Sequence, residues 1–223
     1  MSVTRKSWDS FEAMRAAALE GDAQAQCYLG VCYQNGQGVE QNHQEAVKWL
    51  RKSAEQNDPV GQCYLGVCYW IGQGVPQEYT EAAKWLREAA EQGDPAAQFN
   101  LGMLYETGQG VPQNYAEAVK WYREAAERGY PAAQFNLGVF FEQGQVVEQD
   151  FAEAAKWYRR AADQELADAQ CNLGLCFQTG RGVRQNTQEA VKWFIKAARQ
   201  GNKTAQHNLG LHYAAVEAGH LAE

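Results

Sequence analysis

The amino-acid sequence predicts an all-α solenoid built from one helix–loop–helix unit that is repeated along the chain. A Gln-x-x-Leu-Gly motif begins at Gln26 and returns 36 residues later at Gln62, and a Lys-Trp pair recurs in register with it. A fixed period of this length is typical of solenoids, in which each unit buries its apolar face against its neighbours. The motif begins at Gln26, Gln62, Gln98, Gln134, Gln170 and Gln206, and the pair lies at 48–49, 84–85, 120–121, 156–157 and 192–193.

The first helix of each unit, called helix A, is predicted from apolar residues at helical spacing. In the third unit Phe99, Leu101 and Leu104 supply this pattern. The segment 108–114 then contains two glycines and a proline. Glycine suits a helix C-terminus and proline cannot continue a helix interior, so we expect a loop there.

The second helix of each unit, called helix B, is predicted over 115–127 in the third unit. It ends at Gly129, and Pro131 fits the first turn of the next helix A. Small residues such as Gly102 recur at fixed positions in every unit, beside large ones. Such alternation is what closely packed helices require. The recurring Trp residues of helix B are expected to brace neighbouring repeats.

The 223 residues are expected to form one continuous domain that starts and ends with half-units. The terminal repeats of solenoids commonly differ in sequence from the inner repeats. The expected parts are an N-terminal capping helix at 7–20, repeats at about 22–57, 58–93, 94–129, 130–165 and 166–201, and a C-terminal half-repeat at 202–223.

The charge balance argues against nucleic-acid binding. The chain has 20 basic and 27 acidic residues, a net charge of −7, and its basic residues form no clustered run. The basic residues of helix B, such as Lys48 and Arg51, stand near acids such as Glu45, which predicts a solvated, ion-paired face.

The sequence contains no stretch that resembles a signal peptide or a membrane-spanning helix. We therefore expect a cytoplasmic monomer that does not insert into membranes. It would be secreted or periplasmic if a leader had been removed.

Three patterns together resemble a known family. They are the Ala-Gln-x-x-Leu-Gly-x-x-Tyr helix, the Gly-x-Gly-Val-x-Gln-Asn loop and the Glu-Ala-x-Lys-Trp helix. They resemble Sel-one-like repeats (SLR), a subfamily of the tetratricopeptide-repeat superfamily, over nearly the whole chain. The resemblance implies a right-handed superhelix of antiparallel helix pairs that acts as an adaptor or scaffold. It implies a protein or peptide partner and no single shared ligand.

In arrays of this superfamily the A helices line the concave face, so the resemblance implies that this face binds the partner. The amides of four A helices would form a ladder, which can donate to and accept from a peptide backbone. The ladder consists of Asn100, Asn136, Asn172 and Asn208, and Tyr28 and Tyr64 replace it in the first two repeats. The alternative is that these amides cap loops or face water, and for Phe99 and Phe135 burial between repeats competes with exposure. The candidate partner-binding residues are Phe99, Asn100, Met103, Glu106, Phe135, Asn136, Val139, Glu142, Asn172 and Leu175.

All six cysteines occupy two positions of the repeat, five residues apart. Residues at this spacing on a helix lie roughly 8–9 Å apart, so they cannot form a disulfide within one helix. Three alternatives remain. The thiols pack as small buried hydrophobes, they bind Zn²⁺ or Cu(I), or they form a redox bridge between repeats, with Cys32 facing the next helix A near Cys63. The candidate metal ligands are Cys27, Cys32, Cys63, Cys68, Cys171, Cys176, His207 and His212.

No motif indicates an enzyme. The Gly36-Gln37-Gly38 pattern lies between two helices rather than after a strand, so it is a helix-stop loop rather than a dinucleotide-binding turn. Val146 replaces the second glycine of this loop in the fourth repeat, which argues against a strict need for a positive φ there. His43 is isolated and is expected to face solvent. No cofactor is expected unless the metal alternative holds.

Overall fold

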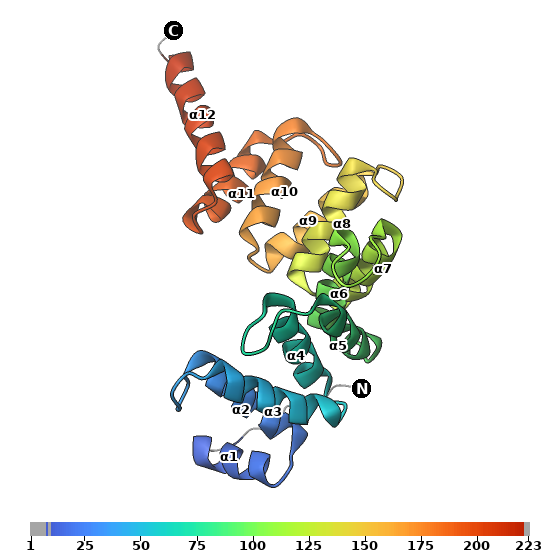
Figure 1. Cartoon of the computed structure of the whole chain (residues 1–223). Coiled ribbons are helices and arrows are strands. Elements are labelled where there is room, and N and C mark those ends of the chain that lie inside the picture. Colours follow the sequence, from blue (N-terminus) through green and yellow to red (C-terminus); the bar gives the residue numbers. More distant parts are fainter. Residues whose placement is uncertain (1–7, 9, 221–223) are drawn as a thin grey trace. The chain divides into compact units, whose positions relative to one another are not determined.

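The computed structural model describes residue 8 and residues 10–220, and in this part of the chain it contains twelve helices and no strand. Helices A and B alternate along the chain, as the repeat predicts (Figure 1). The A helices are α2 (Ala23–Asn35), α4 (Pro59–Ile71), α6 (Pro95–Thr107), α8 (Pro131–Gln143), α10 (Ala167–Thr179) and α12 (Lys203–His220). The B helices are α1 (Phe11–Leu19), α3 (His43–Glu55), α5 (Tyr79–Glu91), α7 (Tyr115–Glu127), α9 (Phe151–Asp163) and α11 (Thr187–Arg199).

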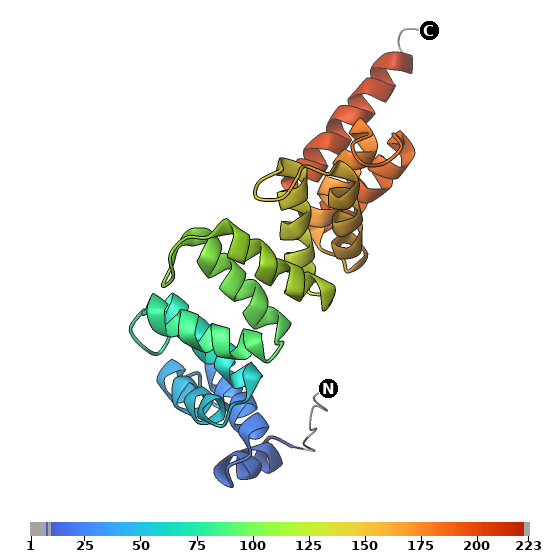
Figure 2. The same ribbon diagram turned by 90° about the vertical axis from the view of Figure 1, so that its right-hand side faces the viewer.

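The chain divides into two compact units, one up to residue 124 and one from residue 125. Each unit has its own apolar core, made where consecutive A and B helices pack on one another (Figure 2). The boundary falls inside α7. The single domain expected from the sequence stays a prediction. The expected N-terminal capping helix begins at Phe11, and residue 7 lies outside the described residues.

The residues that begin and end each helix repeat as faithfully as the motif does. Asp22, Asp58 and Asp94 cap three A helices, and each carboxylate accepts the backbone N–H three residues on. The A helices α2, α4, α6, α8 and α10 end at a glycine in the left-handed conformation. The loop predicted after each of these helices is therefore confirmed.

A glycine in the middle of each A helix lets helix B of the same repeat approach closely. A Cβ atom on Gly174 would stand 2.6 Å from the ring of Phe194, and one on Gly30 would stand 2.7 Å from Leu50. The same contact recurs at Gly66, Gly102 and Gly138, where the large partners are Leu86, Tyr122 and Tyr158. The predicted pairing of small and large residues is confirmed.

The second glycine of the loop also makes a close contact. Gly74, Gly110 and Gly182 have positive φ, and a Cβ atom on any of them would overlap a backbone carbonyl at the start of the preceding helix B. The fourth repeat keeps this conformation even though the residue is Val146, whose φ is +69°. The inference that this position does not need a positive φ is therefore wrong. Because a β-branched residue is strained there, the loop geometry outweighs the preference of the residue.

Two arginines of helix B, Arg51 and Arg87, do not belong to the solvated ion-paired face that the sequence predicts. In the first unit Arg51 donates to the Tyr69 hydroxyl at 2.5 Å, and Arg87 donates to Tyr105 at 2.9 Å. Each arginine thus joins helix B to the next helix A. The lysines do form the expected exposed pairs, such as Lys48 with Glu45.

The tryptophans of helix B brace the repeats, as predicted. Trp49 packs against the cluster around Met14 and Leu29, and Trp85 packs against the cluster that contains Leu50 and Leu65.

His43 does not face solvent as predicted. It is half-buried, and its Nε2 lies 3.4 Å from the amide nitrogen of Gln73.

Candidate partner-binding face

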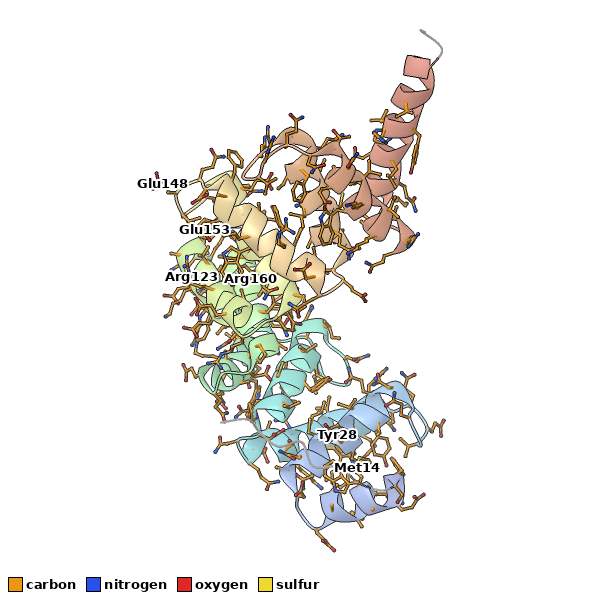
Figure 3. The ribbon with its side chains drawn as sticks, turned by 180° about the vertical axis from the view of Figure 1, so that it is seen from behind. Met14, Tyr28, Arg123, Glu148, Glu153 and Arg160 are labelled. Carbon is orange, nitrogen blue, oxygen red and sulfur yellow. The ribbon has the colours of Figure 1, made fainter. Side chains whose placement is uncertain are left out.

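Each A helix carries a stripe of three positions, spaced four and three residues apart, that share one side of the helix. In α4 the stripe is Val60, Tyr64 and Val67, and Val60 and Tyr64 are 40% and 38% exposed. In α2 the equivalent Tyr28 is also 38% exposed (Figure 3). Its ring forms a T-shaped pair with the ring of Trp8, at a centroid distance of 5.3 Å. Helices α2 and α4 contact each other directly, so the two stripes lie on adjacent helices.

We call the stripes of the first unit the tyrosine face. It presents aromatic and β-branched side chains at the surface, as protein interfaces commonly do. The predicted residues Asn100 and Met103 belong to the third stripe, on α6. The tyrosine face consists of Gln24, Tyr28, Val31, Val60, Tyr64, Val67, Ala96, Asn100 and Met103.

The other predicted residues of α6 lie beside the stripe and are partly engaged within the protein. The ring of Phe99 packs on Tyr122 at a centroid distance of 5.6 Å, and the Tyr122 hydroxyl donates to Glu106 at 2.5 Å. The amide nitrogen of Asn100 lies 4.0 Å from the Cys63 sulfur, on the preceding helix A. All four predicted residues of α6 are half-buried, so each retains surface for a partner.

In the second unit the structure brings Phe135, Glu142 and Asn172 together around Tyr158. The two rings are 5.8 Å apart, and the Tyr158 hydroxyl donates to Glu142 at 2.5 Å and also bonds to the Asn172 side chain. Burial, followed by the hydrogen bond to Glu142, raises the pKa of Tyr158. The hydroxyl therefore stays protonated and acts as a donor. Asn136, Val139 and Leu175 are half-buried.

The tyrosine–glutamate pair was missed by the sequence reasoning, although a signal for it exists. Tyrosine stands over the helix-A glycine only in the third and fourth repeats, and only these repeats have a glutamate sixteen residues earlier. The fifth repeat combines Phe194 with Gln178 instead. The acidic ridge predicted at Glu106 and Glu142 is thus a pair of carboxylates, each held by a tyrosine hydroxyl.

The cysteines lie in buried seams rather than on the open face. Cys27, Cys63, Cys68, Cys171 and Cys176 are buried, and Cys32 is half-buried. Cys27, Cys63 and Cys171, on the A helices, therefore offer no exposed surface to a partner. Burial raises the pKa of every one of these thiols, to about 11 for Cys68. Uncharged thiols in such sites pack as small apolar groups.

The alternative in which Cys32 faces Cys63 is wrong, because Cys32 faces the helices that precede its repeat rather than the repeat that follows it. Cys32 packs against the preceding repeat, in the cluster around Met14, whereas Cys27 and Cys68 share one cluster. Among the residues that the structure describes, no three His, Cys, Asp or Glu side chains lie close enough together to hold a metal ion. The metal alternative stays a prediction.

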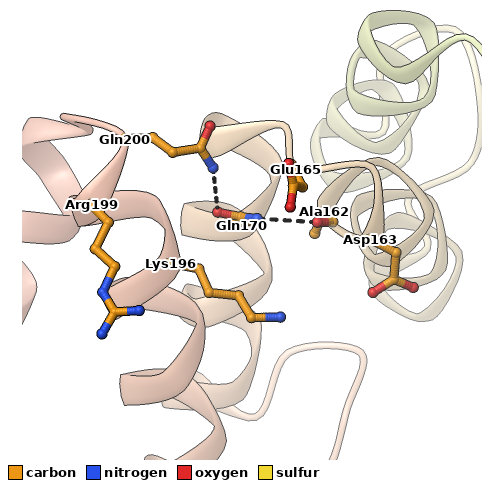
Figure 4. Close-up of a pocket in the computed structure, with 7 residues that line it drawn as sticks. All are labelled: Ala162, Asp163, Glu165, Gln170, Lys196, Arg199 and Gln200. Atoms are coloured by element: carbon orange, nitrogen blue, oxygen red, sulfur yellow. Dashed lines mark hydrogen bonds between the residues drawn. The ribbon is translucent and has the colours of Figure 1, made fainter.

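The glutamine of the repeat motif is structural. In the second unit Gln170 donates to the carbonyl of Ala162 at 3.2 Å and accepts from Gln200 at 2.9 Å (Figure 4). One buried amide therefore links three helices. A surface pocket of about 380 Å³ adjoins it, and its charged lining of Asp163, Glu165, Lys196 and Arg199 is balanced in sign.

The same arrangement occurs at Gln26, Gln62 and Gln134, which accept from Gln56, Gln92 and Gln164. Gln98 differs. Its amide nitrogen donates to Ala90, but its Oε1 is buried and has no hydrogen-bond partner among the described residues. In the sequence, Arg128 stands where these repeats have the donating glutamine.

Comparisons with known proteins agree with this architecture. The model of the Sel1 repeat family matches five consecutive segments, and no curated protein matches the chain at a significant level. The matched segments are 23–58, 59–94, 95–130, 131–166 and 167–202.

Two solved structures are similar over most of the chain. A protective antigen of uropathogenic Escherichia coli with an SLR fold is 38% identical, with a TM-score of 0.82 over 90% of this chain and 43% of that one. A Sel1 repeat protein from Oxalobacter formigenes is 36% identical, with a TM-score of 0.85 over 91% of this chain and 59% of that one. The chain therefore spans less than two thirds of either structure. Within the described residues, no helix is both long and apolar enough to cross a membrane.

Proposed function

The chain belongs to the Sel1 repeat family, and we propose that it is an interaction scaffold whose A helices bind an extended segment of a partner protein. Sel1 repeat proteins commonly act as scaffolds for protein interactions. The observation that carries the proposal is the tyrosine face, where Tyr28, Val60 and Tyr64 stay exposed on neighbouring helices although the rest of the repeat is well packed. Exposed aromatic residues in a row are typical of interaction sites.

The polar groups beside these side chains support an extended peptide as the ligand. Asn100 in the first unit, and Asn136 and Asn172 in the second, are half-buried amides on the stripes. A half-buried amide can satisfy one donor and one acceptor of a peptide backbone, while tyrosine and valine contact its side chains. The ten residues proposed from the sequence, together with Tyr28 and Tyr64, would make these contacts.

Phe135 and Glu142 extend the same arrangement in the second unit. Because Tyr158 holds the Glu142 carboxylate in place, this acid is positioned to meet a basic side chain of the partner without first losing side-chain freedom. The proposal thus specifies apolar residues in a segment that binds the tyrosine face, and at least one basic residue in a segment that binds the second unit.

The test is to select short peptides from a random display library against the immobilised chain. Their affinities for the wild type, Y64A, N136A and I71A are then measured by fluorescence anisotropy. Ile71 is 55% exposed but is not part of a stripe, so I71A is the matched control. We expect Y64A to weaken about tenfold the peptides that bind the first unit, and N136A those that bind the second unit, as loss of a central interface residue does. Peptides that bind all four proteins equally would contradict the proposal.

A further inference from the structure

Helix α12 is an A helix that exposes positions which are buried in the other repeats. Leu209 is only partly buried, whereas its equivalents Leu29 and Leu173 are 1% and 0% exposed. Gly210 is exposed, and a Cβ atom added there would meet nothing within 4 Å. Tyr213 is 51% exposed. One side of α12 packs on α11, so the open positions lie on the side that helix B covers elsewhere.

The rest of the chain shows what covers this surface. In five repeats a large apolar residue of helix B lies over the helix-A glycine, as Phe194 lies over Gly174. Ala190 and Ala197, four residues before and three after Phe194, are buried in the same interface. Gln200, six residues after Phe194, donates to the motif glutamine Gln170. The pattern Ala-x-x-x-large-x-x-Ala-x-x-Gln therefore defines the side chains that fit such a surface.

We propose that α12 is a docking site for an amphipathic helix of the helix-B pattern, presented by a partner protein. The large residue of that helix lies over Gly210, its alanines pack beside Leu209, and its glutamine donates to the exposed Gln206. The interface continues the α11–α12 packing by one more helix, with the chemistry that the other repeats use. It is a different surface from the A-helix stripes, so it adds a second partner site to the scaffold.

The experiment uses the whole chain and a fluorescein-labelled peptide with the sequence of residues 186–200, which contains the α11 helix and its Asn186 cap. Binding is followed by fluorescence anisotropy for the wild type, G210A and G219A. A Cβ atom at the equivalent Gly174 would stand 2.6 Å from Phe194, so alanine at 210 blocks the large residue of the peptide. Gly219 has nothing within 4 Å of its Cβ position, so G219A is the matched control.

We expect G210A to weaken peptide binding at least about tenfold, and G219A to bind like the wild type. A peptide carrying F194A should also lose most of its affinity. A peptide that displaced α11 from its own site over Gly174 would bind G210A and the wild type equally, and this result would overturn the proposal. An absence of binding to the wild type would also overturn it.

Two further measurements keep the result interpretable. G210A should melt at the same temperature as the wild type or higher, because the site is open and alanine favours helix. A lower melting temperature would show that the Gly210 site is not open. Sedimentation of the wild type over a range of concentrations shows whether a second copy occupies α12. If the wild type self-associates and G210A does not, the occupant of α12 is a second copy of this chain rather than a partner protein.

Discussion

Replacing Gly182 by alanine should damage the array far more than the same change at other left-handed glycines. Gly182 lies in the loop between α10 and α11 with φ at +70°, and its Cβ position overlaps the carbonyl of Phe151, at the start of α9. Gly201 has φ at +87° but nothing within 4 Å of its Cβ position. Both substitutions force an alanine into the left-handed conformation. Only G182A also disturbs a contact between repeats, the one between the loop and the start of α9.

The magnitudes follow from these two effects. A left-handed alanine costs about 1–2 kcal/mol, and the loss of freedom in the unfolded chain offsets roughly 0.5–1 kcal/mol of this. G201A should therefore lower the free energy of unfolding by about 1 kcal/mol. G182A adds the displacement of a helix N-terminus, comparable to overpacking at about 1–3 kcal/mol. The total for G182A is about 3 kcal/mol.

Urea titrations of the two variants, followed by circular dichroism, measure this difference. G180A is a useful intermediate, because its φ is +74° and its Cβ position lies 3.3 Å from the Cβ of Gln185, a contact that a small shift relieves. The expected order of stability is G201A, then G180A, then G182A. Equal losses in G182A and G201A would show that the close approach of loop and helix contributes nothing to stability.

Three other features can be tested by substitution. Y158F should lose about 1–3 kcal/mol because it leaves the Glu142 carboxylate without its donor, and adding E142Q should recover part of that loss in thermal melts. In native protein near pH 8, Ellman's reagent should modify the half-buried Cys32 before the buried thiols, and C32S should remove this fast phase. Rapid modification of several thiols would contradict their burial. Burial raises the pKa of Asp94, so its charge destabilises the folded state at pH 7, and the penalty fades as pH falls toward the unfolded value of about 3.8. D94N keeps a capping oxygen for Ala97, so it should match or exceed wild-type stability at pH 7 and lose any advantage near pH 3.5.

The repeat architecture could be predicted from the sequence because each unit carries its own start, stop and packing signals. Capping residues such as Asp58 and glycines such as Gly72 act locally, and the small–large pairing of Gly174 with Phe194 recurs at a fixed spacing. These features need no knowledge of distant contacts. The bounds of the repeats consequently agree with the family match to within one residue.

The binding face was harder to predict, because a helical period does not say which neighbour covers which side. Cys27 and Tyr28 are adjacent in sequence, yet Cys27 is buried and Tyr28 is 38% exposed. Their difference depends on the next helix A, which packs over one side only. Val146 shows the same limit for the backbone, because contacts around the loop impose a conformation that valine itself disfavours.

The interrupted glutamine linkage at Gln98 has a mechanical consequence. A solenoid is held together by successive links, and its weakest link determines where a thermal fluctuation separates it. A buried amide oxygen without a donor costs about 1–3 kcal/mol, and Gln98 has one where Gln62 and Gln134 accept a hydrogen bond. We therefore expect hydrogen exchange in the middle of the array to be faster around α6 than around α4.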